Sequence, residues 1–318
     1  MKERTLTGLA IFFVVAVILL TKIIIGTTII FDIFWGLLII TCAYEMSNIL
    51  KYQNRPNHFI LIMLFPIFLF ALLYLEMAFK LDAVLSGFLV LGLIRVFVLI
   101  GFFITLLSTA RTENEMRTNK IRTSKSAFAF SKSMNNLLGF LYPSFLMMLA
   151  FPINHLAELS YLFGESIPYV STISIIMLSL CFLVPFICDT FAFFVGKTFG
   201  GPHLCPKISP KKTISGFIGG VLATILILLV LYFVLSSVPS LQSAMSALGF
   251  EWWGVALIGL FGSLACTAGD LFESFMKRKA GLKDSGNILP GHGGFLDRLD
   301  GFVFVVPVMM IVMLVIIL

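Results

Sequence analysis

Long apolar stretches alternate with short polar segments along nearly the whole chain. A helix that crosses the hydrocarbon core of a bilayer needs about 20 mostly apolar residues, and nine stretches meet that requirement. They cover residues 5–25, 27–47, 59–79, 83–109, 136–156, 168–196, 214–235, 252–273 and 300–318. The pattern therefore predicts an all-α, polytopic membrane protein with about nine transmembrane helices.

The composition supports this class of protein. Hydrophobic residues make up 59% of the 318 residues and charged residues only 12%, whereas a soluble domain has roughly 25% charged residues. The mean hydropathy of +1.05 excludes a disordered chain and is too high for one water-soluble core. The first apolar stretch has no small-residue cleavage site, so we interpret it as a retained helix and not as a signal peptide.

Lys and Arg residues are concentrated in alternate loops, which predicts the orientation in the membrane. With the N-terminus in the cytoplasm, nearly all of the 22 Lys and Arg residues fall on the cytosolic side. Lys22 and Lys80 fall outside, and Arg95 lies within a helix. The net charge of +6 follows from this bias and needs no nucleic-acid partner. Short loops without an organelle address favour a bacterial plasma membrane.

The chain divides by composition into three parts. Residues 1–110 hold four predicted helices of nearly pure hydrocarbon, with Glu45 and Arg95 as the main candidates for buried charge. Residues 111–135 form a mixed-charge linker, which we expect on the cytosolic surface as an amphipathic helix. Residues 136–318 hold the other helices and the two polar cytosolic loops, 197–213 and 274–298. No inverted repeat of the kind found in many transporters is evident.

The cysteines predict neither disulfides nor a metal site. Of the five cysteines, all but Cys205 lie in apolar stretches, and none forms a Cys-x-x-Cys pair. His203 and Cys205 supply two ligands, whereas a structural zinc site needs four. We interpret the cysteines as structural.

The densest polar segment is residues 274–300. It holds five cationic side chains, three carboxylates and one histidine, which lies in a Pro-Gly-His-Gly-Gly turn. Apolar helices on both sides place this segment at a membrane surface. Lys and Arg mixed with Asp suit an anionic ligand that carries a metal ion, such as a nucleoside triphosphate or a phospholipid headgroup.

Helical spacing aligns Asp270, Glu273, Ser274 and Lys277 on one face at the cytosolic end of the eighth predicted helix. Asp297 opens the ninth helix on the other side of the polar loop. If the loop folds back, Asp270 and Asp297 converge on one cation, and oxygen ligands with room for phosphates are typical of Mg²⁺. The alternative is that these carboxylates only neutralise nearby Lys and Arg. The expected position of Asp270 within the helix, below the membrane surface, disfavours this alternative.

Asp189 is expected to end or interrupt the sixth predicted helix. A carboxylate with hydrocarbon on both sides is costly, so Asp189 is a candidate functional residue. The alternative is an Asp near a helix end that pairs with a loop lysine. The following Gly196-Lys197-Thr198 resembles the end of a phosphate-binding P-loop, but Phe191 stands where that motif needs glycine.

Residues 209–213, Ser-Pro-Lys-Lys-Thr, precede the seventh predicted helix. Two lysines beside free backbone N–H groups at a helix start favour a bound phosphate. Membrane anchoring by positive charge explains the lysines alone, but not the turn and the glycines that follow at Gly216, Gly219 and Gly220.

These motifs resemble the signature of the CDP-diacylglycerol synthases, or phosphatidate cytidylyltransferases, over roughly residues 185–307. The matching residues are Asp189 to Lys197, residues 209–213, Ser274, Lys277, Arg278, Lys283, Asp284, Pro290, His292, Gly293, Gly294, Asp297, Arg298 and Asp300. The first half is similar in hydropathy alone. The family usually has Trp-Glu-Gly after Lys-Lys-Thr, whereas this chain has Ile214-Ser215-Gly216, so no role of that glutamate transfers to Ser215.

The resemblance implies a transferase of phospholipid biosynthesis, which converts CTP and phosphatidic acid to CDP-diacylglycerol and pyrophosphate. It implies Mg²⁺ at Asp270 and Asp297, and a second cation for which Asp300 and Glu273 are candidates. The implied partners are CTP, phosphatidic acid and membrane lipid, and similar proteins suggest a homodimer. Three alternatives stay open: a cytidylyltransferase for an isoprenoid glycerol phosphate, a membrane lipid or polyprenol kinase, and a transporter.

The resemblance also assigns roles to the polar side chains. The catalytic candidates are Asp270, Asp297, Lys277, Arg278, His292 and Arg298. The substrate-binding candidates are Asp189, Ser209, Lys211, Lys212, Thr213, Ser274, Lys283, Asp284 and Asp300. The basic side chains would hold the CTP phosphates or the lipid headgroup, and His292 would assist the leaving pyrophosphate or order its loop.

Overall fold

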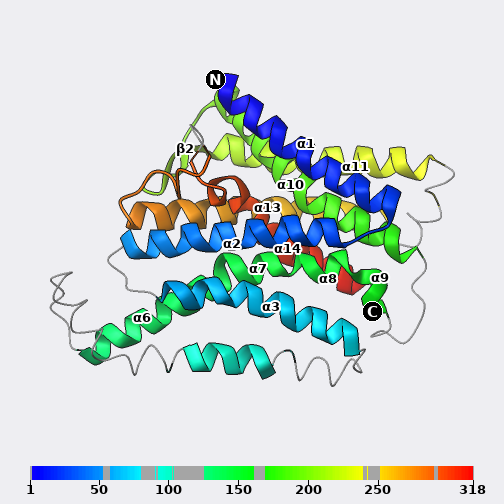
Figure 1. The fold of residues 1–318 in the computed structure, drawn as a ribbon. Helices are drawn as coiled ribbons and strands as arrows, with labels where there is room; N and C mark the ends of the chain where they lie inside the picture. The colour runs from blue at the N-terminus through cyan, green and yellow to red at the C-terminus, as the bar shows by residue number, and fades with distance from the viewer. Residues whose placement is uncertain are drawn as a thin grey trace. The chain divides into compact units, whose positions relative to one another are not determined.

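The computed structural model of the chain is almost entirely helical (Figure 1). It describes residues 2–52, 58–79, 90, 92–101, 103, 125–160, 169–238, 242, 251–289 and 293–317. Within these residues the strands are confined to one two-stranded antiparallel sheet. The predicted all-α class is confirmed, and the small sheet is an addition to it.

The helices are α1 (Lys2–Ile25), α2 (Ile29–Tyr52), α3 (Phe59–Phe79), α6 (Lys125–Gly139), the π-helix η1 (Phe140–Phe145), α7 (Leu146–Met148), α8 (Ala150–Asn154), α9 (Leu156–Leu159), α10 (Val170–Phe199), α11 (Ile214–Ser236), α13 (Trp252–Lys279) and α14 (Leu296–Ile317). The strands are β1 (His203–Cys205) and β2 (Ser209–Thr213). The predicted linker is described only from residue 125 onward, where α6 begins.

Seven helices in the described part of the chain are long and apolar enough to cross a membrane. They are Ile29–Lys51, Phe59–Phe79, Phe130–Asn154, Val170–Phe199, Ile214–Ser236, Trp252–Lys279 and Leu296–Ile316. Each corresponds to one of the predicted stretches. The first predicted stretch lies in α1, of which Phe13–Ile25 is a shorter apolar helix, and the stretch 83–109 lies mostly outside the described residues. The chain is a multi-pass membrane protein, whereas the count of nine and the side of the N-terminus stay predictions.

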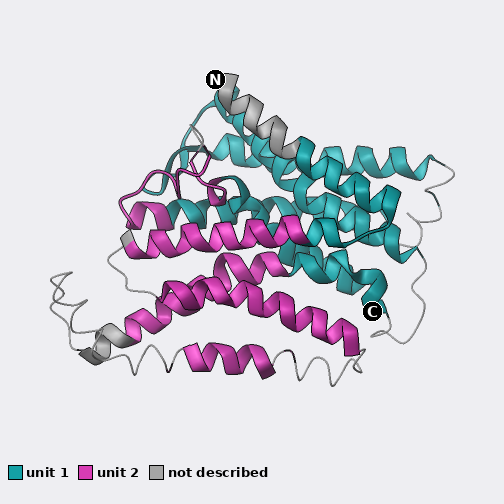
Figure 2. Ribbon diagram, viewed as in Figure 1, with its two compact units in different colours: residues 1–32, 149–275, 298–318 teal, residues 33–148, 276–297 magenta. Residues whose placement is uncertain are grey.

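The chain packs into two compact units, each assembled from separate segments (Figure 2). Unit 1 comprises residues 1–32, 149–275 and 298–318, and unit 2 comprises residues 33–148 and 276–297. The last part of unit 2, residues 276–297, is most of the polar loop 274–298, which we call the signature loop. This loop therefore packs with the N-terminal half of the chain. The division by composition at residues 110 and 135 stays a prediction.

In unit 1, glycines bring α10 and α11 together. A Cβ atom at Gly216 would lie 2.6 Å from the carbonyl oxygen of Ala192, and one at Gly220 would lie 2.8 Å from that of Cys188. Small residues allow such close approach between helices in lipid, where packing contacts drive association. The glycines after the Ser-Pro-Lys-Lys-Thr segment are thus explained by helix packing.

A buried polar network joins four segments of unit 1. The Nζ atom of Lys22 on α1 donates hydrogen bonds to Asn154 O (2.6 Å), Asn154 Oδ1 (2.7 Å) and Ser174 Oγ (2.7 Å). Asn154 Nδ2 in turn donates to Asp32 Oδ1 at 2.9 Å, and His155 Nε2 lies 2.7 Å from Asp32 Oδ2. Lys22 is only 8% exposed, so its charge is stabilised by these contacts and not by water.

In unit 2, α2 contacts α7, and α3 packs beside the π-helix η1. The buried Trp35 Nε1 donates to the carbonyl oxygen of Met147 at 2.9 Å. The rings of Phe65 and Phe140 stack with their centroids 4.8 Å apart. These contacts join α2 to α7 and α3 to η1.

We expect Gly220→Val to destabilise unit 1, because the added side chain must collide with the backbone of α10. Overpacking of this kind costs about 1–3 kcal/mol, so the midpoint of thermal unfolding in detergent should fall by several degrees. Ile218→Val is the matched control, since Ile218 lies on the same helix and is 50% exposed. Equal midpoints for the two variants would contradict the packing role of Gly220.

Candidate functional site

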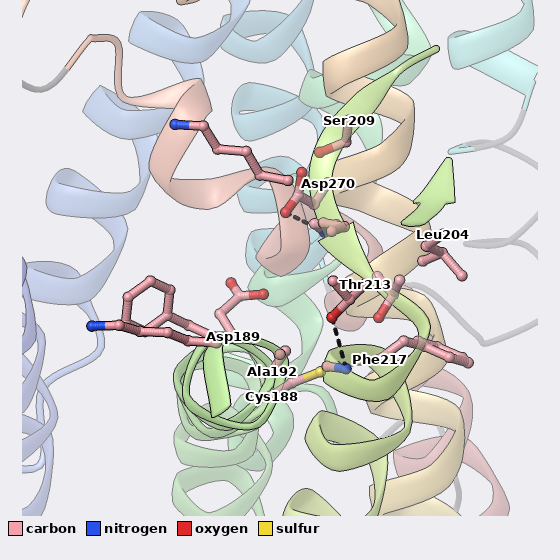
Figure 3. Close-up of a pocket in the computed structure, with 15 residues that line it drawn as sticks. Cys188, Asp189, Ala192, Leu204, Ser209, Thr213, Phe217 and Asp270 are labelled. Atoms are coloured by element: carbon pink, nitrogen blue, oxygen red, sulfur yellow. Dashed lines mark hydrogen bonds and ion pairs between the residues drawn. The ribbon is translucent and has the colours of Figure 1, made fainter. Parts of the chain in front are cut away.

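Unit 1 contains a pocket of about 420 Å³ between α10, the β1–β2 hairpin, the start of α11 and α13 (Figure 3). Six of the predicted site residues line it: Asp189, Ser209, Lys211, Lys212, Thr213 and Asp270. Phe193, Phe217 and other apolar side chains complete its wall. The pocket therefore joins cations and carboxylates in a partly apolar setting, where charges interact more strongly than in water.

The hairpin carries the lysines into the pocket. Strands β1 and β2 pair antiparallel, with His203 opposite Thr213 and Cys205 opposite Ser209. Thr213 then ends the strand and caps α11, because its Oγ1 accepts a hydrogen bond from the Gly216 backbone N–H at 3.1 Å. The segment predicted as a turn at a helix start is a β-strand that leads into a capping residue.

Asp189 lies inside α10, which continues for several residues to Phe199. The prediction that Asp189 ends or interrupts its helix is wrong, because the side chain finds space in the pocket and the helix needs no break. Its carboxylate reaches into the pocket, as does that of Asp270 from α13 (Figure 3). Asp189 also lies 3.7 Å from Cys266 Sγ through its Oδ1 atom.

Lys212 is the central cation of the pocket. Its Nζ atom forms an ion pair with Asp270 Oδ2, and the two side chains are 25% and 22% exposed. Burial alone lowers the pKa of Lys212, but the Asp270 carboxylate, aided by Asp189 and Asp300, more than offsets this, so the pKa is raised above its ordinary value. Lys212 therefore stays charged at neutral pH and can attract an anion.

A second pocket of unit 1, about 390 Å³, is mainly apolar. Its walls come from α1, α10 and α14, with side chains such as Leu19, Phe186 and Phe302. Its polar lining includes Asp189, Thr190 and Arg298. Asp189 lines both this apolar pocket and the lysine pocket.

Unit 2 organises the signature loop around Asp297. Lys277 Nζ lies 2.5 Å from Asp297 Oδ1. On the other oxygen, Oδ2 accepts hydrogen bonds from Ser285 N (2.8 Å), Gly294 N (2.8 Å) and Ser285 Oγ (3.0 Å). The Asp297 side chain is only 8% exposed. These donors replace the water that the buried carboxylate loses.

Two glycines of the signature are required by this geometry. Gly293 has a φ of +84°, which L residues rarely adopt, and a Cβ there would lie 2.6 Å from Asp297 Oδ2. At Gly294 a Cβ would collide with the Ser285 hydroxyl and the Glu45 carboxylate. The glycines thus let the backbone close over Asp297.

The other predicted residues have varied surroundings. Ser274 Oγ donates to Asp270 Oδ1 at 3.3 Å, and Asp300 Oδ1 accepts from Gly301 N at 2.8 Å. Arg278 Nη1 donates to Leu282 O at 3.3 Å. Three further predicted residues, Lys283, Asp284 and Arg298, are exposed. His292 lies outside the described residues, so its role stays a prediction.

The predicted metal ligands belong to different units, Asp270 to unit 1 and Asp297 to unit 2. Their sharing of one ion therefore stays a prediction. Among the described residues, no group of three or more His, Cys, Asp or Glu side chains is placed to hold a metal.

The sequence predicts Glu45 as a candidate for buried charge but assigns it no role. The structure places its carboxylate in contact with the signature loop, through Ser285, Phe295 and Leu296. The signal in the sequence was a carboxylate within a long apolar stretch. Its partners lie more than 200 positions away, so no local pattern could identify them.

A sequence model described as the cytidylyltransferase family matches residues 2–316. The chain is 42% identical over 133 residues to a phosphatidate cytidylyltransferase of Staphylococcus epidermidis, a stretch covering 42% of this chain and 47% of that protein. It is 46% identical over 138 residues to a phosphatidate cytidylyltransferase of Staphylococcus aureus, again covering 42% and 47%. The chain spans about half the length of these curated relatives.

We expect Lys212→Met to weaken binding of inorganic pyrophosphate, because it removes the central charge of the pocket. A charge-assisted hydrogen bond contributes about 1.5–3 kcal/mol, so the Kd measured by calorimetry should rise roughly 10- to 100-fold. Lys207→Met is the control, since Lys207 is an exposed lysine of the same hairpin region. An unchanged Kd in Lys212→Met would show that this pocket does not bind phosphate.

Proposed function

This chain belongs to the cytidylyltransferase family, and we propose that it transfers the cytidylyl group of CTP to phosphatidic acid. The products would be CDP-diacylglycerol and pyrophosphate. The observation that carries the proposal is the pocket in which Lys211, Lys212 and Asp270 meet beside Asp189. The names of the staphylococcal relatives support the same reaction.

In this reaction a phosphate oxygen of phosphatidic acid attacks the α-phosphorus of CTP. The bond from the α-phosphorus to the oxygen that bridges to the β-phosphorus breaks, and the electron pair leaves with pyrophosphate. The nucleophile is already anionic at neutral pH, so no general base is needed. Catalysis then depends on positioning and on neutralising charge. Lys211 and Lys212 are suited to hold the phosphates.

A divalent cation fits the donor chemistry of the pocket. Asp270 supplies carboxylate oxygens, Asp189 lines the same pocket, and the space suits phosphates as the remaining ligands. We propose Mg²⁺ held by Asp270, with Asp297 as the predicted further ligand and a second cation as a further expectation. When bound, the ion would neutralise charge that develops on the phosphate oxygens.

The apolar pocket supports a lipid acceptor. Its wall of aliphatic and aromatic side chains suits an acyl chain, and Arg298 and Thr190 offer a cation and a hydroxyl at its polar lining. A phosphate there would lie beside Asp189, which also lines the lysine pocket. Because CTP is a cytosolic nucleotide, we propose that the site faces the cytosol from the plasma membrane. A homodimer stays a prediction.

The decisive experiment measures pyrophosphate release from CTP by the purified protein, with and without phosphatidic acid. We expect equal amounts of pyrophosphate and CDP-diacylglycerol, complete loss with EDTA and recovery with Mg²⁺. Transfer of the γ-phosphate to lipid would identify a kinase, and the proposal would then be wrong. A parallel reaction with an isoprenoid glycerol phosphate tests which lipid the protein prefers.

We expect Asp270→Asn to lower kcat by at least roughly 100-fold, because it removes a charge that positions the cation at the reacting phosphates. The fold should persist, since the substitution preserves the size of the side chain. The readout is pyrophosphate release at saturating Mg²⁺, together with the unfolding midpoint. Glu251→Gln serves as the control, because Glu251 is an exposed carboxylate just before α13. Near-normal turnover in Asp270→Asn would refute the metal role.

A further inference from the structure

Glu45 is a buried carboxylate on α2, far along the chain from the signature loop. It is 1% exposed, and its helix is a candidate membrane span. A charged side chain in such a segment is costly unless protein groups replace the water it loses. The contacts of Glu45 therefore indicate why the chain carries it.

Both carboxylate oxygens of Glu45 accept hydrogen bonds from the end of the signature loop. Oε1 accepts from Phe295 N at 3.0 Å, and Oε2 accepts from Leu296 N at 2.8 Å. Leu296 is the first residue of α14, so these N–H groups have no partner within the helix. A carboxylate at this position also interacts favourably with the helix dipole. Glu45 thus caps a helix whose own sequence supplies no cap at that point.

Ser285 links Glu45 to Asp297. Its hydroxyl oxygen lies 2.8 Å from Glu45 Oε2 and 3.0 Å from Asp297 Oδ2. A hydroxyl has one proton to donate, so the two carboxylates share it. The Ser285 backbone N–H also donates to Asp297 Oδ2 at 2.8 Å. Glu45, Ser285 and Asp297 therefore form one continuous network.

The backbone of the loop packs closely against the Glu45 side chain at Gly286 and Gly294. A Cβ at Gly286 would lie 2.7 Å from Glu45 Oε1, and one at Gly294 would collide with the Glu45 carboxylate and the Ser285 hydroxyl. Glycine at both positions is thus required by the presence of the glutamate side chain. Gly294 N is at the same time a donor to Asp297 Oδ2, at 2.8 Å.

We infer that Glu45 is a positioning residue, which fixes the backbone at Ser285 and at residues 293–296 and through it the orientation of Asp297. Glu45 acts through Ser285 and the backbone N–H groups of Phe295 and Leu296. The catalytic part of this inference rests on the proposed function. The structural part, the control of the loop by Glu45, does not.

The first test replaces Glu45 by Gln, which preserves size but removes the charge and one acceptor oxygen. A misplacement of about 1 Å at a catalytic group can lower a rate roughly 100-fold, so kcat should fall 10- to 100-fold, whereas KM for CTP should change less than about twofold because the lysine pocket is intact. Glu45→Asp retains the charge and should recover part of kcat. Trp35→Phe is the matched control: it removes a buried hydrogen bond of α2 and should lower the unfolding midpoint without changing kcat.

A double-mutant cycle tests whether Glu45 acts through Ser285. If Glu45 acts through Ser285, the loss of kcat in Glu45→Gln/Ser285→Ala should be smaller than the product of the two single losses, since both remove one network. Trp35→Phe combined with Ser285→Ala should give the product of the single effects. A multiplicative loss of kcat in Glu45→Gln/Ser285→Ala would show that Glu45 does not act through Ser285. Ser285→Ala also reports on the network if Glu45→Gln does not fold.

Amide hydrogen exchange tests the contact without any activity. Exchange of Phe295 and Leu296 should be faster in Glu45→Gln than in the unmodified protein, and unchanged in Trp35→Phe. Protected amides together with normal kcat in Glu45→Gln would overturn the inference. Faster exchange with normal kcat would overturn the positioning role as well. If the unmodified protein made no CDP-diacylglycerol, the proposed function would fail while the exchange result still decided whether Glu45 controls the loop.

Discussion

A charged group that leaves water must be stabilised by other groups of the protein, and in a membrane this requirement is severe. Each buried charge described above satisfies it. Lys22 is held by Asn154 and Ser174, and Asp297 by Lys277, Ser285 and Gly294. The partners of Lys22 lie on segments far apart in the sequence, so the hydrogen bonds that stabilise its charge also tie those segments together. Hydrophobic burial cannot do this alone, because lipid is as apolar as the helices.

Hydropathy predicted the helices well, since a spanning segment depends on a local property, the number of consecutive apolar residues. It failed where the outcome depends on distant groups. Asp189 was expected to disturb its helix, but α10 passes through it because a pocket receives the side chain. Lys22 was expected on the outer side, and the burial of its ammonium group against Asn154 was not predicted. The β1–β2 hairpin was missed because such short strands leave little pattern.

In the candidate site, too, the residues themselves were predicted, whereas the contacts between them were not. Asp189, Lys211, Lys212 and Asp270 were all selected from the sequence, and they line one pocket. Their residue types, their positions in or beside apolar stretches and the family resemblance were enough to select them. Their partners were not predicted: Lys212 pairs with Asp270, and Lys277 with Asp297. Glu45 had a visible signal, but the meaning of that signal depended on Ser285, 240 positions later.

This separation has a consequence for how the protein is made. A ribosome adds roughly 5–20 residues per second, so Ser285 is synthesised some tens of seconds after Glu45, which it follows by 240 residues. During that interval α2 carries a carboxylate whose donors do not yet exist. A nascent chain that stops short of the signature loop leaves this acid group in the bilayer without its native partners, and a quality-control protease or insertase could recognise it as unfinished.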